Sequence, residues 1–294
     1  MPLLAASSDG VSYSGFEQLG ATPHLFISNH RDIALDPLVV GMALESVGRT
    51  STRIAIGDNL VAKPYVGHLM RLNRAFLVRR GITGRREKLE ALKVLSAYIR
   101  YSIGEEDESV WIAQREGRAK DGDDWTETAL LKMLALSADK QTQFSTALAE
   151  LNLQPVAISY EWDPCDIDKA RELAASASGE RYRKGADEDV ETIYKGLFGR
   201  KGRIHVTATA PLTLSDDATS LAAVIDSAIH GTQVDNSLTT STVGTDSLGF
   251  VSSAGDFTNL SVGDWFKVEG FVDAQNDGWY KVKSKTDNDN IETY

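Results

Sequence analysis

The stretch that decides the fold is LFISNHRDIALDPLVV, residues 25–40. It opens with the apolar run Leu25–Ile27, which is typical of a buried β-strand. Polar residues follow where that strand ends. Asp36 and Pro37 then begin a second apolar run and are typical of the N-cap and first residue of a helix. The stretch therefore predicts a strand, a polar loop and a helix.

The polar loop of this stretch holds a histidine and carboxylates. His30 stands at the strand-to-helix junction, and Asp36 stands at the start of the predicted helix. A carboxylate beside an imidazole fixes the tautomer and offsets the charge that develops when the ring takes a proton. We therefore predict that His30 is a general base paired with Asp36, with Asp32 as the fallback partner. Because isolated His–Asp pairs are often structural, the rest of the chain has to support this role.

Composition sets limits on function. The chain has 294 residues and a net charge of -11, so one large domain or two ordinary ones are expected and nucleic acid is not an expected partner. An anionic substrate must then meet a local basic cluster. Cys165 is the only cysteine, which favours a reducing, cytoplasmic location. No apolar run approaches a membrane span, and no signal peptide is expected at the start.

Apolar runs and amphipathic segments alternate from residue 25 to residue 229. The expected strands are Leu25–Ser28, Thr52–Ile56, Ala75–Val78, Ser109–Ala113, Pro155–Tyr160 and Arg203–Ala208. The expected helices are Asp36–Ser46, Gly84–Tyr101, Thr126–Ala138, Gln143–Leu151, Ile167–Ala177, Asp187–Leu197 and Ser220–Ile229. This alternation predicts an α/β fold with a mostly parallel sheet flanked by helices. Residues 1–23 and 62–72 carry no clear pattern of either kind.

Polar and basic residues follow several of these strands, at the edge where open α/β sheets bind ligands. The loop QREGRAKDG, residues 114–122, places three cations around a Glu-Gly turn. Glycine lets a backbone approach a ligand closely, and arginine binds phosphate with two parallel hydrogen bonds. The predicted substrate-binding residues are Asn29, Asp58, Arg79, Arg115, Glu116, Gly117 and Arg118.

Four blocks of the sequence resemble the glycerolipid acyltransferase superfamily in order and spacing. They are Asn29-His30 with Asp36, Gly57–Leu60 with Ala75–Arg80, Glu116–Arg118, and Pro155–Tyr160. The resemblance covers residues 11–231, is nearest to soluble bacterial members, and implies their α/β fold. One departure stands out: the superfamily usually spaces its histidine and aspartate as His-x4-Asp, whereas Asp36 lies one residue further along.

The resemblance also implies an activity. The chain would move a fatty acyl group from acyl-CoA or acyl-carrier protein to a hydroxyl of glycerol-3-phosphate or 1-acylglycerol-3-phosphate, in phospholipid biosynthesis. His30 would be the base, Asp36 would orient it, and Arg79, Arg115 and Arg118 would hold the acceptor phosphate. The acyl thioester is then a co-substrate. No other cofactor and no metal is expected, and the cytoplasmic enzyme would meet the inner face of the membrane peripherally.

The composition changes near residue 233. Short alternating runs, WFKV at 265–268 and WYKV at 279–282, are separated by Gly-Asp and Asn-Asp-Gly turns. They resemble a β module of phage tail or virion proteins. We predict an acyltransferase domain over 1–232 that lacks part of its N-terminus, a linker over 233–245, and a small, incomplete antiparallel β module over 246–294.

Two other functions remain open at this point. The same His–Asp pair, acting on water, would make a thioester hydrolase, although a hydrolase does not need the basic loop at 115–120. Alternatively, the chain is a phage-associated structural or fusion protein whose acyltransferase-like domain is inactive. Acyl turnover with and without a glycerol phosphate separates the first of these from acyl transfer.

Overall fold

The computed structural model describes residues 2–61, 64–122, 124–179, 182, 185 and 187–232, and five strands further along the chain. Contacts between residues divide the chain into two compact units, Met1–Gln233 and Val234–Tyr294. The first unit contains all the residues predicted to form the site. Residues 238–242, which we predicted to lie in a linker, form a strand, and the rest of that linker lies largely outside the described residues.

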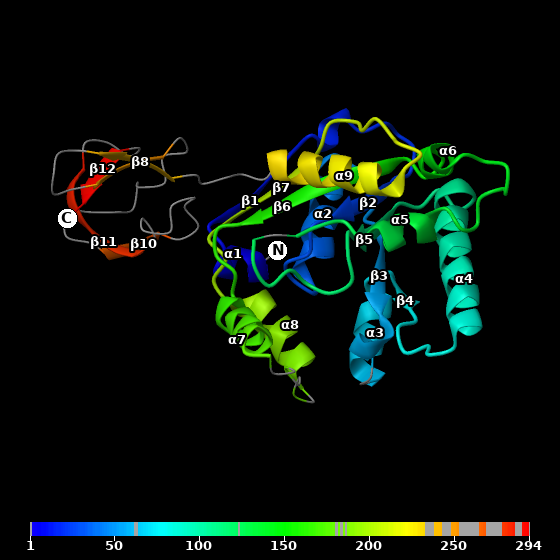
Figure 1. Ribbon diagram of the computed structural model, residues 1–294, viewed down its shortest axis with the longest axis horizontal. Helices are drawn as coiled ribbons and strands as arrows, with labels where there is room; N and C mark the ends of the chain where they lie inside the picture. Colours follow the sequence, from blue (N-terminus) through cyan, green and yellow to red (C-terminus); the bar gives the residue numbers. More distant parts are fainter. Residues whose placement is uncertain are drawn as a thin grey trace. The chain divides into compact units, whose positions relative to one another are not determined.

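A seven-stranded sheet organises the first unit (Figure 1). Its order is β1-β7-β6-β2-β5-β3-β4, and every neighbouring pair is parallel except β6 with β7. The strands are β1 (Gly10–Ser14), β2 (Leu25–Ser28), β3 (Arg53–Gly57), β4 (Ala75–Val78), β5 (Val110–Ala113), β6 (Leu153–Tyr160) and β7 (Arg203–Ala208). The mostly parallel α/β sheet predicted from the sequence is confirmed.

Helices cover both faces of this sheet. They are α1 (Pro2–Ser7), α2 (Leu35–Ser46), α3 (Pro64–Leu72), α4 (Arg85–Gly104), α5 (Thr128–Leu134), α6 (Phe144–Ala149), α7 (Asp166–Ala177), α8 (Glu188–Phe198) and α9 (Ala218–Thr232). In β2, Leu25 and Ile27 pack in one core cluster with α4, α5 and α9, while Phe26 packs in the other with α2. Central parallel strands are buried on both faces, which is why β2 is apolar throughout.

Two segments without a clear sequence pattern form regular structure. The first residues form α1 and the edge strand β1, which pairs in parallel with β7 from Gly10 to Ser14. The sequence of β1 is short and rich in serine and glycine, so its pairing with β7, rather than its propensity, determines that it is a strand. Gly15 then turns the chain with φ 80°, and a Cβ there would lie 2.1 Å from the carbonyl oxygen of Ala208. The segment before β4 forms α3.

The second unit is a five-stranded antiparallel sheet of order β10-β11-β12-β9-β8. Its strands are β8 (Leu238–Thr242), β9 (Leu248–Ser252), β10 (Trp265–Val268), β11 (Gly278–Lys285) and β12 (Asn290–Thr293). The predicted antiparallel module is therefore present. Its likeness to phage proteins remains a prediction.

Asn29 joins two central strands where they end. Its amide Nδ2 donates to the Ile158 carbonyl oxygen at 2.9 Å, and its Oδ1 accepts from the Ile158 N–H at 2.8 Å. The side chain is completely buried. It therefore acts as a clamp between the end of β2 and β6, and it fixes the position from which the next residue, His30, projects.

We expect Asn29→Ala to lower the free energy of unfolding by about 2–4 kcal/mol, because it leaves the buried N–H and carbonyl of Ile158 without partners. Denaturant unfolding of the variant measures this loss. Asn73→Ala is the matched control, since Asn73 bonds the Leu69 carbonyl at an exposed position, and we expect a change within about 0.5 kcal/mol. Equal, small losses in both variants would contradict the clamp.

Candidate active site

His30 and Asp36 are in direct contact. The His30 Nδ1 lies 2.8 Å from Asp36 Oδ2. Because a carboxylate only accepts, Nδ1 carries the proton and donates it, and the lone pair of Nε2 is left as the basic site. The His30 side chain is 14% exposed and the Asp36 side chain is completely buried. The longer His-x5-Asp spacing therefore still brings the two side chains together.

Asp36 collects four hydrogen bonds. In addition to His30, its Oδ2 accepts from the backbone N–H groups of Arg31 and Asp32 at 2.7 and 3.0 Å. Its Oδ1 accepts from the Tyr160 hydroxyl, at the end of β6, at 2.8 Å. Burial and the Asp36 charge raise the pKa of Tyr160 well above its usual value, so this phenol stays protonated and remains a donor. The buried charge of Asp36 is thus fully compensated.

Asp32, the fallback partner of His30, bonds the backbone at the start of α2 instead. Its Oδ1 accepts from the N–H groups of Ala34 and Leu35 at 2.9 and 2.8 Å, so it caps the start of α2. The prediction that Asp36 is the N-cap is wrong, because α2 begins at Leu35 and the Asp36 side chain turns back to His30. Burial, and then the Asp36 charge, raise the pKa of Asp32.

The loop after β5 holds the His30 loop in place. Asp124 Oδ2 accepts from the His30 backbone N–H at 2.6 Å, and the Ala119 N–H donates to the His30 carbonyl oxygen at 2.8 Å. The Lys169 ammonium donates to the Arg31 carbonyl oxygen at 2.8 Å. Burial raises the pKa of Asp124, whose contact with His30 was not visible in the sequence. His30 is therefore held through its backbone as well as through its ring.

Four cations line a cavity of about 100 Å³ beside the His30 ring. They are Arg80, Arg115, Arg118 and Lys120, and Gly117 lines the same cavity. The Nε of Arg115 and Nη1 of Arg118 are buried and have no hydrogen-bond partner among the residues that the structure describes. Buried donors without partners are costly, so an anion in this cavity would satisfy them.

Arg80 rather than Arg79 belongs to this cavity. Arg79 lines a different cavity, between β4 and α4, and its role in binding substrate remains a prediction. A Cβ at Gly57, at the end of β3, would lie 2.6 Å from Arg80 Nε, so that glycine makes room for the Arg80 side chain. Alternation of side chains does not separate the two arginines, because Phe76, Leu77, Val78 and Arg79 all line the larger cavity.

Three more predicted residues take supporting positions. Asn29 is completely buried in its clamp with Ile158, and its binding role remains a prediction. Asp58 Oδ1 accepts from the Arg80 N–H at 3.1 Å. Glu116 is 65% exposed, and its Oε1 lies 3.5 Å from Arg80 Nε. Asp58 and Glu116 thus both contact Arg80, and their binding roles remain predictions.

Much of the first unit matches a known protein family. The Acyltransferase family model matches residues 10–159, which contain β1 to β5 and most of β6. The chain belongs to the Acyltransferase family. This confirms the resemblance to glycerolipid acyltransferases that the four sequence blocks indicated. None of the curated proteins compared with the chain matches it.

One solved structure that matches is the 1-acyl-sn-glycerophosphate (LPA) acyltransferase PlsC from Thermotoga maritima. It is 12% identical, the match covers 77% of this chain and 73% of that chain, and the TM-score is 0.37. Within the described part of the chain, no helix is long and apolar enough to cross a membrane, and no three His, Cys, Asp or Glu residues are grouped as for a metal ion.

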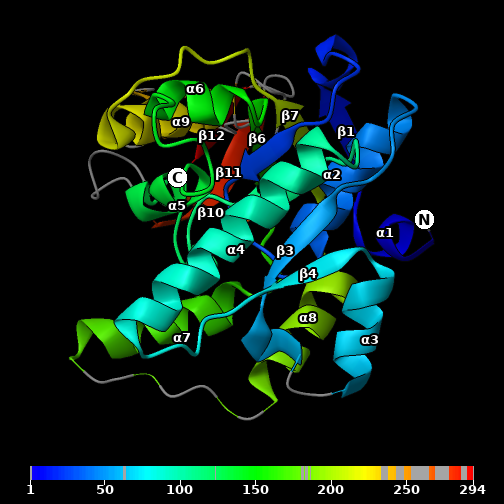
Figure 2. The same cartoon turned by 90° about the vertical axis from the view of Figure 1, so that its right-hand side faces the viewer.

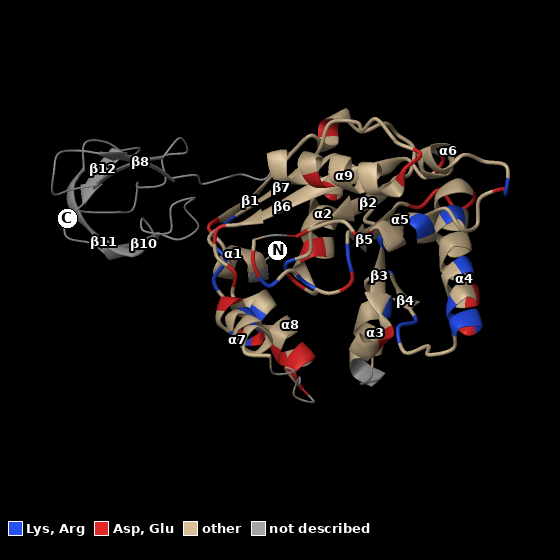
Figure 3. Ribbon diagram, viewed as in Figure 1, with Lys and Arg blue, Asp and Glu red and all other residues tan. Residues whose placement is uncertain are grey.

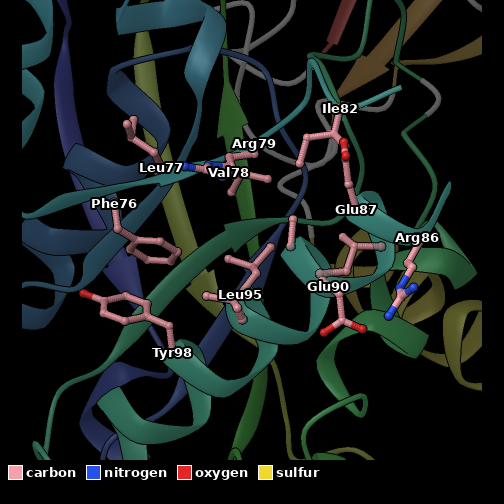
Figure 4. Close-up of a pocket in the computed structure, with 13 residues that line it drawn as sticks. Phe76, Leu77, Val78, Arg79, Ile82, Arg86, Glu87, Glu90, Leu95 and Tyr98 are labelled. Atoms are coloured by element: carbon pink, nitrogen blue, oxygen red, sulfur yellow. The ribbon is translucent and has the colours of Figure 1, made fainter. Parts of the chain in front are cut away.

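This acyltransferase has a second, larger cavity of about 820 Å³ between β4 and α4 (Figure 4). Its walls are mainly apolar, and the rings of Phe76 and Tyr98 meet inside it with centroids 4.8 Å apart. Arg79 lines this cavity and the next residue, Arg80, lines the His30 cavity. The two cavities therefore lie on either side of the end of β4.

We expect Tyr160→Phe to lower kcat for acyl transfer about tenfold, because Asp36 loses a donor that fixes its orientation. With one hydrogen bond fewer, the Asp36 carboxylate interacts more strongly with the His30 ring and stabilises its protonated form. The acid limb of the pH–rate profile should therefore move to higher pH. Tyr182→Phe is the control, since the Tyr182 hydroxyl donates to Glu188. An unchanged profile in Tyr160→Phe would rule out a positioning role.

Proposed function

We propose that the chain transfers a fatty acyl group from a thioester, acyl-CoA or acyl-carrier protein, to a hydroxyl of glycerol-3-phosphate or 1-acylglycerol-3-phosphate. The observation that carries this proposal is that His30, paired with Asp36, lines one cavity together with four cations. A base and an anion site side by side suit an acceptor that carries both a hydroxyl and a phosphate. The protein as a whole has a net charge of -11, so this local cluster is unusual within it.

His30 supplies the proton transfers. Its Nε2 takes the proton of the acceptor hydroxyl while that oxygen attacks the thioester carbonyl carbon. The imidazolium is stabilised by Asp36, 2.8 Å from Nδ1. When the carbon–sulfur bond breaks, the thiolate takes the proton back from Nε2. No covalent intermediate with the protein is needed, and such base assistance contributes about 10²–10⁴ in rate.

The basic residues hold the acceptor phosphate. Arg115 and Arg118 offer buried donors that the described residues leave without hydrogen bonds, and Arg80 and Lys120 line the same cavity. The Lys120 ammonium also contacts Glu172 at 2.8 Å. Arg80 and Arg115 lie farther from their carboxylates, at 3.5 Å from Glu116 and 3.9 Å from Asp124, so the three arginines are the stronger candidates for direct contact. A fixed phosphate places the acceptor hydroxyl against the base.

The larger cavity suits the acyl chain. Its volume and apolar walls fit a flexible hydrocarbon, and it lies beside the cavity that holds His30. A donor thioester at His30 would thus direct its chain under α4. In this proposal, the size of the cavity sets the length of the acyl chain that the protein accepts.

The test is an acyl-transfer assay with acyl-CoA and acyl-carrier protein donors, each with and without glycerol-3-phosphate or 1-acylglycerol-3-phosphate. We expect acceptor-dependent release of thiol, reduced about 10³-fold or more in His30→Ala. Circular dichroism checks that the variant is folded. Thiol release that needs no acceptor would show a hydrolase instead, and wild-type transfer in His30→Ala would refute the mechanism.

A pair of neighbouring arginines tests the phosphate site. We expect Arg80→Ala to raise the KM for the phosphate acceptor about 10–100-fold, because one charged hydrogen bond is lost. Arg79→Ala removes the same chemical group one residue away and should leave that KM unchanged, since Arg79 lines the other cavity. Equal effects in the two variants would contradict the assignment of Arg80.

A further inference from the structure

We propose that α3, β4 and α4 form a docking face for a bilayer that contains anionic lipids. In Figure 2 these three elements lie next to one another on the side facing the viewer. α3 contacts β4, and β4 and α4 line the same cavity, so the three elements are neighbours in the fold. Docking at this face does not depend on the chemistry at His30.

Large apolar side chains are exposed on all three elements. Leu72 is 82% exposed, Val94 is 69% exposed and Leu69 is 54% exposed. Leu77 on β4 and Leu89 on α4 add to them. Single exposed apolar residues are ordinary, but a group on neighbouring elements is typical of an interaction surface. Leu77 and Val94 also line the large cavity, so the apolar surface continues into it.

The charge of this surface is opposite to that of the protein. Residues 64–94 contain eight Lys or Arg and two Glu, a net charge of +6, whereas the whole chain carries -11. Figure 3 shows basic residues at the start of α4 and acidic residues on α8. Arg71, Arg79, Arg85, Arg86 and Lys88 are exposed on or between the three elements. Basic residues around apolar side chains are the pattern that anionic bilayers bind.

A second group of exposed apolar residues does not share this charge. Tyr194 and Phe198 on α8 are in contact, with ring centroids 4.6 Å apart and planes tilted by 32°, and are 64% and 54% exposed. The first turn of α8 carries Glu188, Asp189 and Glu191, which an anionic surface repels. This helix therefore serves as an internal control.

An acidic carrier protein is the competing partner for the basic face. Binding such a partner through charge alone does not explain why Leu69 and Leu72 are exposed.

The experiment is flotation of the full chain with vesicles of phosphatidylcholine alone, or of phosphatidylcholine and phosphatidylglycerol in equal parts. We expect binding only to the second vesicles, and weaker binding as salt is raised. The double variant Leu69→Ser with Leu72→Ser should bind about tenfold more weakly. Arg85→Glu with Lys88→Glu should bind about 100-fold more weakly. Tyr194→Ser with Phe198→Ser should bind as the wild type does.

Three results would overturn the proposal. They are equal binding to both kinds of vesicle, unchanged binding when Leu69 and Leu72 are replaced, and loss of acyl-carrier protein binding in the charge variant while vesicle binding persists. Thermal unfolding confirms that each variant is folded. Flotation requires no turnover, so a failed docking face and a failed acyl-transfer assay are distinguishable.

Discussion

The rest of the site depends on the buried carboxylate of Asp36. Four donors converge on it: the His30 ring, two backbone N–H groups of the loop, and the Tyr160 hydroxyl. A buried charge is tolerated only when it is paired and hydrogen-bonded, so these groups have to hold one geometry together. That geometry joins the end of β2, the start of α2 and the end of β6. The position of the His30 ring therefore depends on the packing of three elements.

A second constraint is electrostatic. An acidic chain would repel a phosphate, and this protein offsets that repulsion by gathering its cations locally. Arg80, Arg115, Arg118 and Lys120 come from the ends of β4 and β5 and meet beside His30. Most of the remaining cations of residues 64–94, namely Arg71, Arg79, Arg85, Arg86, Lys88 and Lys93, are exposed in the same region. In our proposal, this one basic region of the chain binds both the substrate phosphate and the anionic bilayer.

The two cavities differ in the polarity of the residues that line them. The smaller one is lined by His30 and the cations, and the larger one is walled mainly by apolar side chains of β4 and α4. β4 is the edge strand of the sheet. Among the described helices, only α4 lines the large cavity with it. An edge position leaves room for a chain-shaped ligand that a central strand, packed on both faces, does not offer.

The sequence by itself determined the strand-and-helix alternation, the His30 loop and the order of the four blocks, because local apolar period and turn chemistry encode them. It did not determine which polar residue faces which partner. Arg79 and Arg80 are chemically identical, and only the folded structure shows that Arg80 lines the His30 cavity and Arg79 the other. Asn29 reads as a site residue until its clamp with Ile158, 129 residues away, is seen. Strand β1 likewise exists because β7 pairs with it. Contacts between residues distant in sequence decided these points, and no local pattern records them.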